Sequence, residues 1–185
     1  MAEPSSLGER PPLGASELGN PLLRFVLWVL DPEDNPTSVV YGLLTVGTVI
    51  AVESARSVDI AAEIEAVVLI IFLYWLAHAY ASLLGRRLSS GSTISVRTIG
   101  QALRREWALV RGATVPVVIM LLTWMLGWSI SAIEWSGIIS AIVLLVLFEV
   151  AAGLRSHLPP LGVVVQGLVG VTFGLTLLVV RALLV

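Results

Sequence analysis

Two ionisable residues, His78 and Glu149, lie inside long apolar stretches of the sequence. An ionisable group inside a bilayer costs about 2.5–3.5 kcal/mol on insertion scales, so it usually faces other helices and finds a partner there. Histidine changes charge near neutral pH, and a neighbouring carboxylate sets its basicity. Tyr74 and Ser82 lie four residues before and after His78, on the same face of a helix. One functional interpretation is therefore a proton or solute pathway through these four residues.

Structural interpretations of the same residues compete with this pathway. His78 and Glu149 could form a buried hydrogen-bonded pair that locks two helices together. Alternatively, Glu149 is protonated or extends towards the membrane surface, where Arg155 lies within two turns. A proton relay usually needs more ionisable groups than one histidine and one glutamate. We therefore favour the structural interpretations.

Most catalytic and cofactor chemistries lack their residues in this sequence. There is no cysteine, and all eleven basic residues are arginine. Disulfides, thiolate metal sites and lysine Schiff bases are thereby excluded. There is also no phosphate-binding glycine loop, HExxH or GxSxG motif. A hydrolase with Ser129 as nucleophile would need a nearby histidine, but His78 is predicted roughly 15 Å away along the membrane normal. We expect no enzyme activity, no cofactor and no metal site.

The composition indicates that lipid surrounds most of the chain. Of the 185 residues, 57% are hydrophobic and 13% are charged. Soluble domains are about 45–50% apolar and about 25% charged. One soluble core of this size could not bury so much apolar surface. We therefore expect an integral membrane protein.

The apolar runs predict an all-α fold, a polytopic bundle of five transmembrane helices. Residues 1–20 are rich in Pro, Gly, Ser and Glu and are expected to form a disordered cytoplasmic tail. Residues 21–185 are expected to form a single membrane domain. Its predicted spans are residues 37–55, 61–84, 113–133, 136–154 and 161–180.

Two shorter segments are predicted to lie in the membrane interface. Residues 22–30 are too short to cross the bilayer. Residues 94–110 form a basic amphipathic pattern, with apolar side chains at steps of three and four. We expect Arg97, Arg104 and Arg105 of this cytoplasmic helix to bind the headgroups of anionic lipids. The basic residues are too few, and too closely tied to an apolar face, to indicate nucleic-acid binding.

The distribution of arginine predicts the orientation. Arg56 and Arg181 flank the side away from the N-terminus. The positive-inside rule therefore places the N-terminus in the cytoplasm and the C-terminus on the opposite side. Arginine without lysine, beside abundant Ala, Gly, Val and Leu, suggests a GC-rich bacterial genome and hence a bacterial inner membrane. The arginines on the N-terminal side are residues 10, 24, 86, 87, 97, 104, 105, 111 and 155.

Small residues form a stripe along the last predicted span. Gly162, Gln166, Gly170 and Gly174 recur every four residues. Such a stripe lets helices approach closely, and the glutamine can hydrogen-bond across the contact. It could dock the span within its own bundle or form a contact between copies.

These observations lead to two hypotheses about function. The first is a non-enzymatic membrane protein that works by association, in a homo-oligomer or with a membrane protein partner. The alternative is a small oligomeric transporter or channel, which His78 and Glu149 could link to protons. No motif is specific enough to transfer an activity from a known family.

Overall fold

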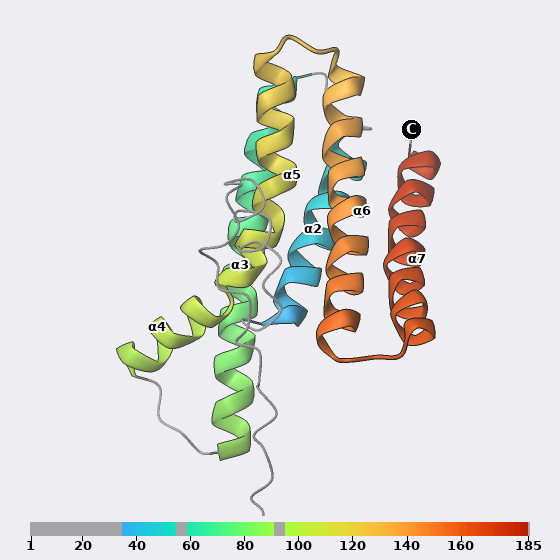
Figure 1. Cartoon of the computed structure of the whole chain (residues 1–185). Coiled ribbons are helices and arrows are strands. Elements are labelled where there is room, and N and C mark those ends of the chain that lie inside the picture. Colours follow the sequence, from blue (N-terminus) through green and yellow to red (C-terminus); the bar gives the residue numbers. More distant parts are fainter. Residues whose placement is uncertain (1–34, 55–58, 91–94, 185) are drawn as a thin grey trace, which may run out of the picture.

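A computed structural model describes residues 35–54, 59–90 and 95–184 of the chain (Figure 1). The tail expected at residues 1–20 and the interfacial helix expected at residues 22–30 lie outside the described residues. The first residue of the predicted amphipathic helix, at position 94, also lies outside them.

The described chain is helical, and it confirms the prediction of an all-α bundle with five spans. Five stretches are long and apolar enough to cross a membrane: α2, α3, the stretch from Val96 to Met125, α6 and α7. By helix length and hydropathy, the chain is a multi-pass membrane protein. The helices are α2 (Pro36–Glu53), α3 (Ile60–Ser90), α4 (Val96–Arg105), α5 (Trp107–Met125), α6 (Ile130–Arg155) and α7 (Pro160–Leu184).

Helix α2 is the centre of the bundle. It packs against α3, α5, α6 and α7, while α6 also contacts α5 and α7. Helix α4 points away from the bundle at a steep angle to α5 (Figure 1). It rests against the second half of α3, which extends beyond the other helices at that end (Figure 1).

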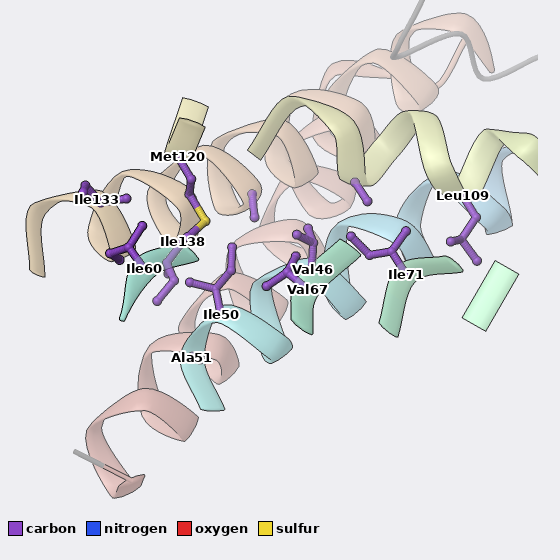
Figure 2. Close-up of a cluster of buried hydrophobic side chains, with 12 residues drawn as sticks. Val46, Ile50, Ala51, Ile60, Val67, Ile71, Leu109, Met120, Ile133 and Ile138 are labelled. Atoms are coloured by element: carbon purple, nitrogen blue, oxygen red, sulfur yellow. The ribbon is translucent and has the colours of Figure 1, made fainter. Parts of the chain in front are cut away.

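One face of α2 supplies the apolar core. Val39, Leu43, Val46 and Ile50 recur at steps of three and four, and each is at most 1% exposed. Figure 2 shows the core side chains converging from α2, α3, α5 and α6. The residues that meet Val46 and Ile50 there include Ile60, Val67, Ile71, Leu109, Met120, Ile133 and Ile138.

Helices α2 and α5 are in backbone contact. A Cβ atom added to Gly42 would lie 2.1 Å from the carbonyl oxygen of Leu109. One added to Gly112 would lie 2.7 Å from the carbonyl oxygen of Val39. Only glycine fits at these two positions, because any side chain would separate the two backbones.

The turn between the third and fourth spans lies about eight residues earlier than the sequence predicts. The prediction ended the third span at residue 133, but α5 ends at Met125 and α6 begins at Ile130. Gly127 adopts a φ of 73°, which favours glycine, and the side chain of Ser129 accepts a hydrogen bond from the Ala132 backbone N–H. Glu134, expected beyond the end of a span, therefore lies inside α6.

The remaining boundaries also differ from the prediction. Helix α3 runs through Gly85 to Ser90, where the sequence suggested an end near residue 84. The amphipathic pattern at 94–110 is divided at Glu106, between α4 and α5. Pro116 consequently lies well inside α5. The position of α4 at a membrane surface stays a prediction.

Candidate functional site

Glu106 is buried at the joint between α4 and α5. It follows the last residue of α4 and precedes the first residue of α5, and it is 4% exposed. Its side chain makes no hydrogen bond that caps α5. The carboxylate turns instead towards α2 and α3, whose polar side chains surround it.

Three neutral donors hold this carboxylate. The Ser38 hydroxyl and the Asn35 amide nitrogen, the latter at 3.3 Å, donate to Oε2 of Glu106. The Ser82 hydroxyl donates to Oε1 at 3.1 Å. Ser38 lies in the first turn of α2, and Asn35 caps that helix by accepting a hydrogen bond from the Ser38 backbone N–H. The residues that begin α2 thus also bind the joint between α4 and α5.

His78 completes this site, which we call the Glu106 cluster (Asn35, Ser38, His78, Ser82 and Glu106). Its Nδ1 atom lies 3.4 Å from Oε2 of Glu106, and its side chain is 29% exposed. The rings of Tyr41 and Tyr74 lie 5.1 and 5.6 Å from the imidazole, centroid to centroid. A carboxylate at Nδ1 orients the ring and leaves Nε2 for a second partner.

The structure brings together three of the four residues of the predicted polar network. Tyr74, His78 and Ser82 lie on one face of α3, and the last two contact Glu106. Glu149 lies elsewhere, between α6 and α7, where it accepts a hydrogen bond from Nε2 of Gln166 at 2.7 Å. His78 therefore lies beside Glu106 and not beside Glu149, whose contact with His78 the sequence left open.

Sequence reasoning missed Glu106 because of its neighbours. It follows Arg104 and Arg105 in an amphipathic stretch, where an acidic residue is expected to face water. A usable signal was present, however. Glu106 is the only acidic residue between Glu65 and Glu134, so it is the only carboxylate that those 68 positions could offer to His78.

A second polar cluster lies at the opposite end of α2. Nη2 of Arg181 lies 2.8 Å from Oε2 of Glu134, and Nη1 donates to the Ser54 hydroxyl at 2.9 Å. The guanidinium also stacks over the Trp135 ring, 4.7 Å from its centroid. Arg181 and Glu134 are only 7% and 5% exposed. We call these four residues, together with Glu63, the Arg181 cluster.

Glu63 is the most deeply buried acid of the Arg181 cluster. It lies in the first turn of α3 and is 1% exposed. Neither of its carboxyl oxygens has a hydrogen-bond partner among the described residues. The charges of Glu134, Arg181 and Glu53 lie close enough to act on it.

An apolar core separates the two clusters. Ser38 and Ser54 are roughly 24 Å apart along α2, at 1.5 Å per residue. The buried residues of α2 between them are all apolar. Within the part of the chain that the structure describes, no three His, Cys, Asp or Glu side chains are grouped to hold a metal ion.

The small-residue stripe of α7 packs inside the bundle. A Cβ atom added to Gly174 would lie 2.6 Å from Cγ2 of Ile142, and one added to Gly170 would lie 3.1 Å from Cα of Val146. Gln166 bonds Glu149 across the same contact. Gly162 lies at the turn, where its nearest neighbour is Leu158. The stripe therefore docks α7 on α6, the first of its two expected roles.

The outer side of α3 carries two apolar grooves. One, of about 560 Å³, runs between α3 and α4 and has Arg87 as its only charged lining residue. The other, of about 370 Å³, runs between α3 and α5. Trp75 stands between α4 and α5: its Nε1 donates to the Leu103 carbonyl oxygen at 3.1 Å, and its ring meets Trp107 edge to face.

The three arginines expected to bind lipid headgroups, Arg97, Arg104 and Arg105, are exposed on α4. Arg104 lines a shallow pocket with Trp107 at the joint. Lipid binding by these residues stays a prediction.

Comparison of the chain with known protein families, with curated proteins and with solved structures finds no match.

Proposed function

We propose that this chain is a non-enzymatic, proton-linked membrane protein in which the pair His78–Glu106 takes up and releases a proton. One observation carries the proposal. The partly exposed imidazole of His78 lies 3.4 Å from the buried carboxylate of Glu106, and three neutral donors hold that carboxylate in place. A histidine paired with a carboxylate is an arrangement that can accept and donate a proton.

The joint between α4 and α5 is the element that a proton would move. Glu106 is the buried side chain of this joint that binds both α2 and α3. Proton binding at His78 strengthens the attraction between α3 and Glu106, and proton release weakens it. The angle of α4 relative to α5 would thus follow the charge of His78.

The apolar core between the two clusters limits how a proton could cross the membrane. A continuous polar route along α2 is absent from the described residues, because the buried positions there are apolar. Transport would therefore require a change of conformation or a route between copies. We propose a small homo-oligomeric transporter for this reason.

A proton-flux assay tests this proposal. The full chain is reconstituted in liposomes that contain a pH-sensitive dye, and proton entry is followed after a membrane potential is imposed. We expect His78→Ala and Glu106→Gln to reduce the flux to the level of protein-free vesicles. Glu149→Gln is the matched control, because this buried glutamate bonds Gln166 and lies outside the cluster.

Two results would contradict the proton-linked function. One is wild-type flux no greater than that of protein-free vesicles. The other is equal flux in wild type, His78→Ala and Glu106→Gln. Circular dichroism of each variant in detergent ensures that the folded proteins are compared.

Association in the membrane is the second candidate function, and the two grooves beside α3 favour it. Both grooves are apolar, and the one between α3 and α4 is lined by Arg87 as well, so they suit an anionic lipid or a helix of a second copy. In the liposomes above, this function predicts no proton flux in the wild type. It also predicts fewer cross-linked dimers for Leu76→Arg, within the groove, than for Leu183→Arg on exposed α7.

A further inference from the structure

We infer that the Arg181 cluster is a proton-binding site, in which Glu63 carries the proton as a neutral carboxylic acid. The inference does not depend on the role proposed for His78 and Glu106, since all its residues lie at the other end of α2.

Charge balance is the first argument. Among the described residues, Arg181 is the one cation that acts on the two buried carboxyl groups, Glu63 and Glu134. Arg181 is already committed to Glu134, at 2.8 Å, and to the Ser54 hydroxyl, at 2.9 Å. If both acids were ionised, the buried cluster would carry an uncompensated negative charge, which a low-dielectric interior strongly disfavours. One proton removes that charge.

The surroundings of Glu63 show which acid holds the proton. Glu134 accepts a charge-assisted hydrogen bond from Nη2 of Arg181 at 2.8 Å. Glu63 has no hydrogen-bond donor among the described residues and is 1% exposed. An ionised carboxylate in this position would have no hydrogen-bond donor within the part of the chain that the structure describes.

The charged groups that face Glu63 come from three other helices. Glu53 lies at the end of α2, Glu134 in α6 and Arg181 in α7. Two of these charges are negative, so they add to the effect of burial and favour the neutral form of Glu63. Arg181 opposes them, but its guanidinium is bonded to Glu134.

A proton fits this site better than a metal cation. Calcium and magnesium take about six or more oxygen ligands, many of them carboxylates, carbonyls or water. Two of the oxygens that the Arg181 cluster could offer to a cation, Oε2 of Glu134 and the Ser54 hydroxyl, already bind Arg181. A proton needs only the carboxyl oxygen on which it resides.

Proton occupancy at Glu63 has a structural consequence. When Glu63 loses its proton, it competes with Glu134 for the guanidinium of Arg181. The ion pair that ties the end of α7 to the beginning of α6 then weakens. The site thereby couples a proton at this end of the bundle to the docking of α7.

Infrared spectroscopy of the full chain in lipid nanodiscs tests the inference. A protonated carboxylic acid has a C=O stretching band that a carboxylate lacks. At neutral pH, we expect Glu63→Gln to remove such a band from the wild-type spectrum. Glu65→Gln, which changes an exposed acid two positions along α3, is the matched control and should leave the band unchanged.

A second variant distinguishes charge balance from burial alone. In Glu134→Gln, Arg181 loses its carboxylate partner, and we expect Glu63 to ionise and take its place. The band assigned to Glu63 should therefore disappear from this variant too, although Glu63 is still present. If burial alone kept the proton on Glu63, the band would persist.

Two outcomes would overturn the inference. The first is a neutral-pH spectrum in which Glu63→Gln removes no carboxylic acid band. The second is a wild-type protein whose thermal stability depends on sodium or calcium ions and whose dependence is lost in Glu63→Gln, which would make the site a cation site.

Discussion

Three buried glutamates of this chain differ in the number of donors that reach them. Glu106 receives three hydrogen bonds besides the contact with His78, Glu149 receives one from Gln166, and Glu63 receives none from the described residues. The same side chain therefore has three different roles: an anchor for a helix joint, a link between α6 and α7, and a carrier of a proton.

The hydrogen bond from Ser38 to Glu106 predicts a loss of stability on mutation. Ser38→Ala removes one donor from a buried carboxylate, which should lower the free energy of unfolding by about 1.5–3 kcal/mol. Unfolding of the detergent-solubilised protein by denaturant, followed by circular dichroism, measures this change. Ser89→Ala is the control, because Ser89 is exposed and donates only to carbonyl groups of its own helix. Equal stability of the two variants would contradict the role assigned to Ser38.

The identities of the buried acids could be read from the sequence, but their partners could not. Glu149 and His78 stood out because each interrupts an apolar run. Glu106 and Glu134 did not, since one follows two arginines and the other lay near a presumed loop. Which charge compensates which depends on contacts between residues as far apart as Ser38 and Glu106, or Glu134 and Arg181, and hydropathy contains no information on such contacts.

At the scale of helices, the tightest contact is the one between α2 and α5. Gly42 and Gly112 lie against the backbone of the opposite helix, so this contact is formed by main-chain atoms. It brings the start of α2 close to the joint at Glu106. The precise approach of two helices thus supports the polar cluster next to it.

Adding one methyl group at this contact should destabilise the bundle. In Gly42→Ala, the new Cβ would lie 2.1 Å from the Leu109 carbonyl oxygen, and the helices must separate. Overpacking of this kind costs about 1–3 kcal/mol, which a lower midpoint of thermal unfolding in detergent would report. Gly85→Ala is the matched control, because nothing lies within 4 Å of its added Cβ. It should stabilise α3 by about 0.5–1 kcal/mol through helix propensity.

The number and type of the helices could be predicted, whereas several boundaries could not. Long apolar runs report burial in lipid reliably, so all five spans were found. The turn at Gly127 was not predicted, because apolar residues such as Trp128 and Ile130 continue the hydrophobic run through it. A turn made by one left-handed glycine and one serine cap leaves little trace in composition.

At the scale of the whole molecule, charge is unequally distributed between the two ends of the bundle. Arg86, Arg87, Arg104 and Arg105 lie at the end that holds the Glu106 cluster. At the other end, Arg181 is bonded to Glu134 and contributes no free positive charge. The positive-inside rule counts arginines near the ends of the spans, so this distribution predicts that the end with the Glu106 cluster faces the cytoplasm.

This asymmetry predicts the orientation of the chain in its membrane. A reporter active only outside the cytoplasm should be active when fused after Asp59, and inactive when fused after Ser90. A cytoplasmic reporter at the same two positions should give the opposite pattern. Cytoplasmic activity after Asp59 would reverse the orientation and place the Glu106 cluster at the outer surface.

The ion pair between Arg181 and Glu134 also bears on how this protein is made. Glu134 precedes its arginine by 47 positions, so the ribosome delivers the acid well before the base that neutralises it. During that interval α6 has a carboxyl group without its counter-ion, and stable insertion must await the arrival of the last helix. A nascent chain that stops short of Arg181 would leave Glu134 without its counter-ion.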